Sequence, residues 1–349
     1  MRMKASIPSK DKLFDFFPES KFPPHMTKRL LLLATAGFVL IGKAHGYGNA
    51  GHQAVGTIAA HYLKDSRAEK EVAALLKKED LARAATWPDR AKLPDKYLTA
   101  EMKAFVANNP EHHIYHYCDV PFQQKAYREG ITGTNPQDIV HTLRACIQVL
   151  QSPDDKADNP LKINKHVALM LIAHYIGDLH QPLHVGCSYI DDKDNFVDPE
   201  TGAKGNPDAG GNNLRFTASS SLHGYWDTQT VKLARDHAGK EDFSGFLIAR
   251  YPVKPEWNGT GAAVTWPDQW ANDTLGLAKA CFDGITPRER KLVPKDEKHE
   301  EHFEWKITLP PGYDVKSRDV VEVELTKAGY RLAALLKAVW PDSATPEAK

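Results

Sequence analysis

The chain has 349 residues, 45 Lys and Arg, 45 Asp and Glu, and a hydrophobic content of 42%. This length suits one large domain or two ordinary ones, and the hydrophobic content supports a globular core. The balanced charge excludes a strongly basic chain, and no basic surface for nucleic acid or anionic lipid is visible, so a polyanionic substrate would require bound metal to supply the positive field.

A secretory signal peptide is predicted at residues 26–46. A basic start at Lys28 and Arg29 precedes an apolar run, which is followed by small residues of the kind found at cleavage sites. The apolar run, residues 30–42, is shorter than the roughly 20 residues that a membrane span needs. We therefore predict cleavage before Tyr47 and a secreted or periplasmic protein that keeps no membrane anchor.

The predicted mature domain covers residues 47–349. Residues 1–25 are polar and unpatterned, which makes Met26 an alternative start of the chain. Without residues 1–46 the chain keeps 37 Lys and Arg against 42 Asp and Glu, so its net charge is about −5.

Helical periodicity dominates the mature chain, and few stretches alternate in the manner of strands. No internal repeat and no linker between apolar halves is visible, so we predict one mainly helical domain of the all-α class. Pro136, which follows Asn135, suits the first turn of a helix behind a capping residue. The expected helices cover residues 50–63, 68–78, 99–107, 136–151, 163–180, 222–237, 267–282 and 319–338.

Two polar stretches interrupt this helical pattern. Residues 188–213 are rich in Asp, Gly and Asn, and residues 283–317 are charged and contain several prolines. Both are expected to be long surface loops.

One predicted helix combines an apolar surface on every side with two polar side chains. Residues 167–173 are apolar throughout, which is typical of a helix that is buried on all faces. His174 and Asp178 lie four residues apart and therefore point the same way, one turn above the other. Burial of an imidazole and a carboxylate is costly unless they are hydrogen-bonded, paired or bound to a cation. Pro182 should end the helix and return His184 toward the same place.

Further histidines and aspartates lie beside apolar or helical sequence. His223 and Asp227 repeat the spacing of four residues, and His52, Asp89 and His116 occur nearer the N-terminus. Each alone is more often a core or surface residue than a ligand. Together they form a set of neutral imidazoles and carboxylates, which are ligands that zinc prefers. The sequence thus predicts a multinuclear metal site.

The four cysteines, Cys118, Cys146, Cys187 and Cys281, allow three disulfide pairings in an oxidising compartment, and the sequence does not choose among them. Cys118 and Cys187 each follow a candidate metal histidine closely, so these two could form one bridge. Cys146 and Cys281 lie in helical patterns and would form the other. Zinc binding by thiolates is less favoured, because no C-x-x-C spacing is present.

Seven motifs in a fixed order connect the chain to a known family. They are G-H-x-x-V (Gly51 to Val55), W-x-D (Trp87 to Asp89), H-Y-x-D-x-P (His116 to Pro121), H-x-x-G-D-x-H-Q-P-L-H (His174 to His184), G-G-N-N (Gly210 to Asn213), L-H-x-x-W-D (Leu222 to Asp227) and K-A-G-x-R-L-A (Lys327 to Ala333). With these motifs the chain, over about residues 47–340, resembles the zinc-dependent single-strand-specific nucleases of fungi and plants and their bacterial 3′-nucleotidase relatives. The resemblance implies a helical fold that is distantly related to zinc phospholipase C.

The resemblance also implies three zinc ions. The implied ligands are Asp89, His116, His174 and Asp178 for the first ion, His184, His223 and Asp227 for the second, and Tyr47, His52 and the bridging Asp178 for the third. Tyr47 would bind through its free amine and its carbonyl. Relatives usually have Trp at this position, but backbone atoms make the bonds, so Tyr should serve. Because an uncleaved chain lacks the free amine, processing is expected to complete the site.

Three zinc ions carry six positive charges. Three aspartates and a bridging hydroxide carry four negative charges. The excess of about two suits a phosphodiester, which explains how an acidic protein can bind one. The resemblance implies in-line attack of the hydroxide on phosphorus, catalysis by Asp89 and Asp178, and products with 5′-phosphates. Lys92, three residues after Asp89, is a candidate phosphate contact, although it equally suits an ordinary solvated lysine.

Other residues resemble a nucleotide-binding pocket. Tyr117 and Asp119 match positions where a base is stacked and hydrogen-bonded, with Asn212 and Asn213 beside them. The asparagines would otherwise shape a Gly-rich turn. The implied function is endonucleolytic cleavage of single-stranded RNA and DNA, with 3′-nucleotidase activity as a further possibility and no stable protein partner.

Three histidines near these motifs are not predicted to be ligands. His180 is expected to be a hydrogen-bonding group behind the ligands. His112 and His113 are expected to be loop residues.

Two alternative functions stay open at this point. A zinc phospholipase C resembles this chain in the H-x-x-x-D spacing and the ligand at the first residue, but such enzymes tend to use Glu where Asp227 stands. Asp119, the asparagine pair and the lack of a basic lipid-binding face favour nucleotides over lipids. A zinc-binding protein without catalytic activity would bind the metal tightly and show no turnover.

Overall fold

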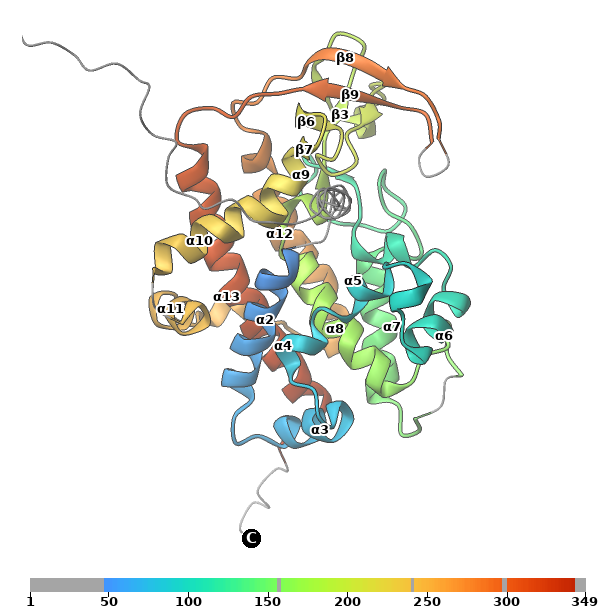
Figure 1. The fold of residues 1–349 in the computed structure, drawn as a ribbon, viewed down its shortest axis with the longest axis vertical. Coiled ribbons are helices and arrows are strands. Elements are labelled where there is room, and N and C mark those ends of the chain that lie inside the picture. The colour runs from blue at the N-terminus through green and yellow to red at the C-terminus, as the bar shows by residue number, and fades with distance from the viewer. Residues whose placement is uncertain (1–46, 156–157, 240–241, 297–299, 343–349) are drawn as a thin grey trace, which may run out of the picture. The chain divides into compact units, whose positions relative to one another are not determined.

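The computed structural model describes residues 47–155, 158–239, 242–296 and 300–342. Helices make up most of them, so the predicted all-α class is confirmed (Figure 1). The α-helices are α2 (Gly48–Leu63), α3 (Arg67–Leu76), α4 (Leu81–Ala84), α5 (Trp87–Ala91), α6 (Ala100–Asn108), α7 (Ile139–Gln151), α8 (Lys165–Leu179), α9 (Leu222–Gly224), α10 (Thr230–Ala238), α11 (Phe243–Arg250), α12 (Trp266–Phe282) and α13 (Tyr313–Val339). The predicted signal peptide and extension, residues 1–46, lie outside the described residues.

Shorter helical turns and short strands connect these helices. The 3₁₀ helices are η1 (Asp95–Tyr97), η2 (His112–His116), η3 (Pro182–His184), η4 (Pro199–Thr201), η6 (Pro255–Trp257) and η7 (Ala263–Thr265), and η5 (Tyr225–Gln229) is a π-helix. The strands are β1 (Val120–Pro121), β2 (Gly186–Cys187), β3 (Tyr189–Ile190), β4 (Phe196–Val197), β5 (Asn206–Pro207), β6 (Leu214–Thr217), β7 (Ser220–Ser221), β8 (Arg288–Val293) and β9 (His302–Lys306). No helix among the described residues is long and apolar enough to cross a membrane.

The central helix is α8, in which every residue from Val167 to Leu179 is buried. Asn164 caps its start, because the side chain accepts a hydrogen bond from the Val167 N–H at 2.9 Å. The helix ends shortly before Pro182, as the sequence predicts. Helices α2, α7 and α13 all contact it. The polar side chains of α8 are therefore held in place by packing on several sides.

Helices α2 and α13 run side by side at very short distance (Figure 1). A Cβ on Gly329 of α13 would lie 2.5 Å from the Cβ of Ile58 on α2, so glycine is needed for this approach. Val55 and Leu325 are fully buried nearby on the same two helices. This contact presses the first helix of the described chain against the last one.

Helix α7 starts at Ile139 instead of residue 136. Asp138 caps it by accepting hydrogen bonds from the N–H groups of Val140 and His141, at 3.0 and 3.1 Å. The prediction that Pro136 occupies the first turn is therefore wrong, because the later capping carboxylate sets the start.

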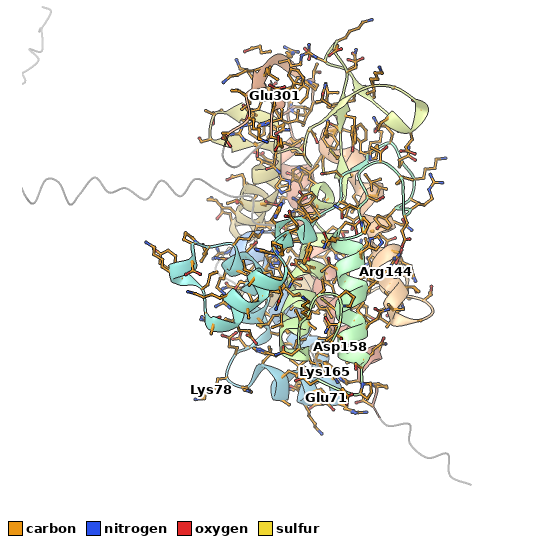
Figure 2. The ribbon with its side chains drawn as sticks, turned by 90° about the vertical axis from the view of Figure 1, so that its right-hand side faces the viewer. Glu71, Lys78, Arg144, Asp158, Lys165 and Glu301 are labelled. Carbon is orange, nitrogen blue, oxygen red and sulfur yellow. The ribbon has the colours of Figure 1, made fainter. Side chains whose placement is uncertain are left out.

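A partly exposed ion pair connects α7 with α12. Arg144, which is labelled in Figure 2, donates from Nε to Asp268 Oδ2 at 2.9 Å in the first turn of α12. Its guanidinium also pairs with Glu129, in the segment before α7. Exposed pairs of this kind contribute roughly 1 kcal/mol or less, so the buried faces of the helices account for most of the stability here.

Several other helices differ from the prediction. Helix α13 begins at Tyr313 instead of residue 319, directly after Gly312, whose φ of 77° sets the turn before it. The predicted helix at residues 222–237 is divided into α9, η5 and α10, with a π-turn in the middle. Helices α4, α5 and α11 were not predicted, because each is short and lacks a long apolar stripe.

The two predicted loops contain strands. In the first, β3 pairs antiparallel with both β4 and β5. In the second, β8 and β9 form an antiparallel pair, and β9 joins β6 in parallel to give the sheet order β7-β6-β9-β8. The loop prediction is therefore wrong for these segments. Strand β8 reads Arg-Glu-Arg-Lys-Leu-Val, and its largely exposed charged side chains conceal the strand pattern.

All four cysteines lie in the described residues and are free, buried thiols. The structure thus contains neither of the predicted disulfide bonds. Cys118 donates to the Val185 carbonyl, and Cys187 donates to Asp208 Oδ1 at 3.0 Å. Burial raises the pKa of each thiol, so these groups behave as core side chains and not as reactive thiolates.

Candidate metal centre

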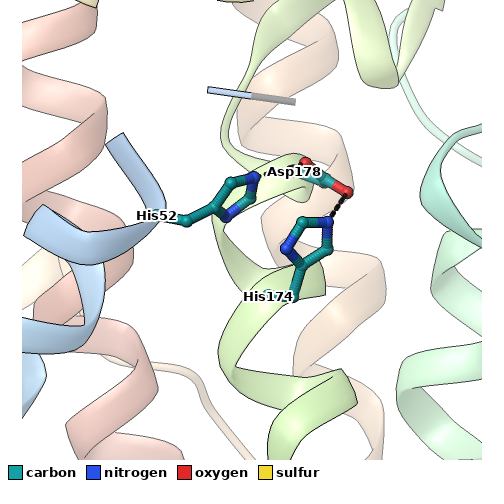
Figure 3. Close-up of side chains that lie close together, drawn as sticks. All are labelled: His52, His174 and Asp178. Carbon is teal, nitrogen blue, oxygen red and sulfur yellow. Dashed lines mark ion pairs between the residues drawn. The ribbon is translucent and has the colours of Figure 1, made fainter. Parts of the chain in front are cut away.

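The first group of candidate ligands joins α2 to α8 (Figure 3). His174 and Asp178 lie one turn apart on α8, with His174 Nε2 3.0 Å from Asp178 Oδ2. His52 approaches the other carboxylate oxygen from α2, with its Nε2 3.2 Å from Asp178 Oδ1. The His52 and His174 rings stack with centroids 3.8 Å apart. All three side chains are fully buried.

The close approach of His52 depends on a glycine in α8. A Cβ on Gly177 would lie 2.7 Å from His52 Nδ1, which is shorter than nonbonded atoms tolerate. Gly177 therefore provides the space for the imidazole, and the next residue, Asp178, provides the carboxylate that the imidazole faces.

Asp89 and His116 join this group from two other segments. Asp89 lies in α5, His116 ends η2, and both are buried. His116 Nδ1 is 2.8 Å from Asp178 Oδ2 and 3.1 Å from His174 Nε2. Asp89 Oδ1 is 3.7 Å from His174 Nε2 and 2.8 Å from Lys92 Nζ. The Asp178 carboxylate thus faces these three imidazoles closely, and His184 Nδ1 lies 3.9 Å from its Oδ1.

A second group lies where η3, α9 and η5 meet. His184 Nε2 is 3.6 Å from Asp227 Oδ1, and His223 Nε2 is 3.3 Å from Asp227 Oδ2. Gln181 donates to Asp227 Oδ1 at 2.7 Å and so orients the carboxylate. Asp227 lies in the π-turn of η5, so helix and π-turn together place it opposite His223.

Three of these imidazoles direct Nδ1 at a backbone carbonyl. A donated Nδ1–H selects the neutral tautomer whose Nε2 carries the lone pair, which is the arrangement of metal-bound histidines. The pairs are His174 with Ala85 at 2.7 Å, His184 with His116 at 2.8 Å, and His223 with Gly210 at 2.7 Å.

These residues fit a set of bound cations. Their ligand atoms form three groups, each with all atoms within 4.8 Å of one another: His52, His174 and Asp178; Asp89, His116 and His174; and His184, His223 and Asp227. Buried ligand atoms that lack a hydrogen-bond partner among the described residues include Nδ1 of His52 and Nε2 of His116. An unpaired buried polar atom costs about 1–3 kcal/mol, so several at one place favour cations that would coordinate them. Nitrogen and carboxylate donors without thiolates suit zinc.

The surrounding charges keep the two central carboxylates ionised. Burial by itself raises the pKa of Asp178, but His174, His184 and hydrogen bonds from histidines outweigh it and bring the pKa well below its ordinary value. Burial likewise raises the pKa of Asp227, yet its two histidine neighbours bring it down to about 2. Both groups are therefore anionic at neutral pH, as a cation requires.

The imidazoles divide into two kinds. Burial lowers the pKa of His52 and, with the charge of Lys92 added, lowers that of His116 well below its ordinary value. Burial acts the same way on His184, but the charges of Asp178 and Asp227 outweigh it and raise the pKa to about 9. A metal ion at His184 would therefore displace a proton as it binds.

Tyr47 lies fully buried at the start of α2. Its hydroxyl donates to the backbone carbonyl of His180, at the end of α8, over 2.5 Å. Its own carbonyl accepts the Gly51 N–H at 3.1 Å. A Cβ on Gly48 would lie 3.3 Å from the Asp227 carbonyl, so the backbone of this segment runs beside the second ligand group. The residue predicted to become the N-terminus thus lies in the interior, next to the candidate ligands.

Tyr47→Phe is expected to lower the free energy of unfolding by about 1–3 kcal/mol, because the buried His180 carbonyl loses its donor. Metal content should stay unchanged, since the backbone atoms of residue 47 are retained. Chemical denaturation and metal analysis measure the two quantities. Tyr97→Phe, at a tyrosine that is 58% exposed, is the matched control and should change neither. Equal stability of Tyr47→Phe and the unmodified protein would contradict the importance of this hydrogen bond.

His180 does not join the ligand groups, in line with the sequence-based expectation. Its Nδ1 donates to the Ile176 carbonyl at 2.7 Å, and its Nε2 lies 3.1 Å from Arg331 Nη1. Arg331 is itself buried and donates to the Trp257 carbonyl at 2.9 Å. Arg331, which belongs to the K-A-G-x-R-L-A motif on α13, therefore contacts the end of α8 at His180, the residue that also accepts the Tyr47 hydrogen bond.

A cavity of about 130 Å³ opens beside both ligand groups. The candidate ligands in its wall are His116, His184 and His223. The other polar side chains in its wall are Lys92, His113, Tyr117, Asp119 and Asn212. Asn213, predicted to bind substrate, is not part of this wall: its amide donates to the Pro207 carbonyl at 3.4 Å, and it shapes the turn.

Asp119 lies in the wall of this cavity. Its Oδ1 is buried and has no hydrogen-bond partner among the described residues. Burial and the negative charge of nearby Asp208 raise the pKa of Asp119 to about 7. Asp208 is held by the N–H of Ser188 at 3.1 Å and by the thiol of Cys187 at 3.0 Å. A carboxyl with one unpaired oxygen in a cavity wall suits hydrogen bonding to the edge of a base.

Asp119→Asn is expected to stabilise the metal-free protein at pH 8 and to leave its stability nearly unchanged at pH 4. The folded-state pKa of about 7 lies above the ordinary value of 3.8, so the unmodified protein loses stability as the pH rises from about 4 to 7. The loss has an upper bound of about 4 kcal/mol, and asparagine does not ionise. Thermal unfolding of both chelator-treated proteins across this range measures the effect. Parallel pH profiles would contradict the raised pKa.

Two histidines differ from their predicted status as loop residues. Both belong to η2, where His112 is buried and His113 lines the cavity. In a 3₁₀ helix, residues three apart lie on the same face, so the spacing of His113 and His116 places both on one face. The sequence contains this spacing but does not show that the segment is a 3₁₀ helix.

A mainly helical fold that gathers buried histidines and aspartates beside a cavity with a lysine in its wall is the arrangement expected of a metal-dependent hydrolase. Residues 47–341 match the sequence family described as S1/P1 nuclease. The chain belongs to this family and is a hydrolase that acts on phosphodiester bonds.

The relatives are similar over nearly their whole length. Nuclease S1 of Aspergillus oryzae is 26% identical over 323 residues, which is 89% of this chain and 98% of that protein. Endonuclease 2 of Arabidopsis thaliana is 24% identical over 315 residues, or 85% of this chain and 91% of that protein. Nuclease P1 of Penicillium citrinum is 23% identical over 310 residues, or 82% and 95%.

Proposed function

We propose that the chain is a secreted, zinc-dependent endonuclease that cleaves single-stranded RNA and DNA to products with 5′-phosphates and also removes 3′-phosphates from nucleotides. The observation that carries this proposal is that buried histidines and aspartates form three groups, two of which contribute histidines (His116, His184 and His223) to the wall of one cavity that also contains Tyr117 and Asp119. The motifs of the sequence and the names of the relatives agree with it.

The donor set and its unpaired buried atoms support three zinc ions. Asp89, His116, His174 and Asp178 would hold the first, His184, His223 and Asp227 the second, and His52, Asp178 and the terminal backbone of Tyr47 the third. When bound, zinc would act as a Lewis acid on the phosphate and would lower the pKa of water to supply a nucleophile near neutral pH.

The chain's own groups would position the substrate. Lys92 holds its ammonium 2.8 Å from Asp89 in the cavity wall, where it would contact a phosphate oxygen and offset its charge. Asp89 and Asp178 would act as the catalytic carboxylates by holding the metal ions against the reacting phosphate. Tyr117 and Asp119 would bind a base by stacking and hydrogen bonding, with Asn212 in the same wall.

A preference for single strands follows from the shape of the cavity. Tyr117 and Asp119 lie in a recess that a base can enter after it leaves the stack and its pairing partner. A duplex would have to pay for unpairing, which costs a few kcal/mol per base. Secretion is supported by the signal-peptide pattern of residues 26–46, which also leaves no membrane anchor after cleavage.

The test uses the processed protein on single-stranded DNA, duplex DNA and phosphatidylcholine, together with metal analysis. We expect about three zinc ions per chain, cleavage of the single strand, and 5′-phosphate ends in a terminal labelling assay. Activity on the lipid alone would support the phospholipase C alternative and reject the proposal. Tight zinc binding without turnover of any substrate would support the non-catalytic alternative.

A further inference from the structure

The 3₁₀ helix η2 places its neighbouring residues His112 and His113 on different faces. His112 faces the core, where it is buried and its ring lies 5.5 Å from the Phe105 ring in an edge-on contact. His113 lies three residues before His116, and residues three apart in a 3₁₀ helix share one face. His113 is therefore directed toward the cavity, one turn from a candidate metal ligand.

The wall that contains His113 rises from the metal centre to the solvent. The side chain of His116 is 3% exposed, that of Lys92 is 13% exposed, and that of His113 is 58% exposed. All three line the same cavity. His113 thus forms the outer end of this wall, and no step of the proposed function uses it.

A nucleic-acid strand would have to cross this outer end. The cavity volume of about 130 Å³ is far below the roughly 300–1,000 Å³ of pockets that enclose a whole small ligand. The cavity can therefore take one base, while the neighbouring nucleotides of a strand continue over its rim. A side chain at the rim meets the next nucleotide along the strand.

We propose that His113 is a substrate-binding residue on which the base of that next nucleotide stacks. This inference rests on the proposed nuclease function. Bases stack on aromatic rings, including imidazole, without preference for sequence. Glu111 Oε2 lies 3.6 Å from His113 Nε2, and its carboxylate repels a phosphate at this place. The face of the ring, and not a charged contact, is therefore the recognising surface.

The experiment compares His113→Ala, His113→Phe and His113→Gln with the unmodified processed protein. His61→Ala is the matched control, because His61 is exposed on α2, away from the cavity wall. The first substrate is a single-stranded oligo-deoxyadenosine. The second is a strand of equal length with one adenine among abasic residues, so that a base can occupy the cavity but none can stack beside it. KM and kcat are measured on both, with zinc content, melting temperature and binding of an uncleavable phosphorothioate strand.

His113→Ala is expected to raise KM and the dissociation constant for the oligo-deoxyadenosine about fivefold to tenfold, with kcat within about twofold. His113→Phe should keep the original KM, since it retains the ring, and His113→Gln should resemble alanine. On the one-base strand all variants should match the unmodified protein. Zinc content and melting temperature should not change.

Three results would overturn the inference. The first is an unchanged KM of His113→Ala on the oligo-deoxyadenosine. The second is rescue by Gln instead of Phe, which would indicate a hydrogen bond. The third is loss of zinc from His113→Ala, which would indicate that His113 acts only by positioning His116. If the unmodified protein cleaves neither strand, the proposed nuclease function fails and this inference fails with it.

Discussion

Asp178→Ala is expected to reduce cleavage of single-stranded DNA by at least ~10³-fold, on the order of 4 kcal/mol of transition-state stabilisation. The Asp178 carboxylate lies within 3.2 Å of nitrogen atoms of His52, His116 and His174. Its removal takes one ligand from two of the proposed zinc ions at once. We therefore expect the variant to lose zinc as well as activity, and metal analysis of the purified protein measures that loss.

The control for Asp178→Ala is Asp236→Ala. Asp236 is exposed on α10 and pairs with Lys232 one turn away, so its loss should change activity by less than about twofold. Circular dichroism separates loss of the metal centre from loss of the fold. An Asp178→Ala protein that keeps all its zinc and more than a tenth of its activity would contradict the central position of this carboxylate.

A protein that begins at Gly46 instead of Tyr47 is expected to lose one zinc ion and about 100-fold or more of its activity. In this form the Tyr47 nitrogen belongs to a peptide bond, which is not basic and does not bind a metal ion as an amine does. The extra glycine also has to fit beside Tyr47, which is fully buried. The following residue, Gly48, lies close to the Asp227 carbonyl. Both effects act on the same proposed ion.

The two forms can be prepared from one precursor with proteases that cut before residue 46 or before residue 47. They then differ by a single glycine, and mass spectrometry verifies each terminus. Zinc content and kcat are compared at saturating metal. Equal zinc and equal activity of the two forms would show that the free amine has no part in the centre. The result would not affect the nuclease function itself.

The core of the fold and the position of the centre could be predicted because both follow from local sequence. The apolar run before His174 is buried throughout in α8, and the spacing of four residues places His174 and Asp178 on one face. The motifs then pointed to His52, Asp89 and His116, which lie in distant segments and meet only in the folded chain. Their roles as zinc ligands remain predictions until metal is measured.

Other features could not be predicted because they depend on long-range contacts or on helix type. Strand β9 is defined by its pairing with β6 and β8, which no local pattern reveals. His113 is directed into the cavity because η2 is a 3₁₀ helix, whereas a loop would leave its direction open. The disulfide prediction was wrong for a similar reason. Cys118 donates to the Val185 carbonyl and Cys187 to Asp208, and these long-range contacts leave no trace in the local sequence.

The seventh motif contains no candidate ligand, and the contact between α2 and α13 explains its presence. The lack of a side chain on Gly329 leaves room for Ile58, and Arg331 contacts His180, whose carbonyl accepts the Tyr47 hydroxyl hydrogen. A gene product truncated before residue 313 would therefore retain every candidate metal ligand and still lose the helix that packs against α2 and α8. For genome annotation, an intact set of ligands in a shortened homologue is not sufficient evidence of an active enzyme.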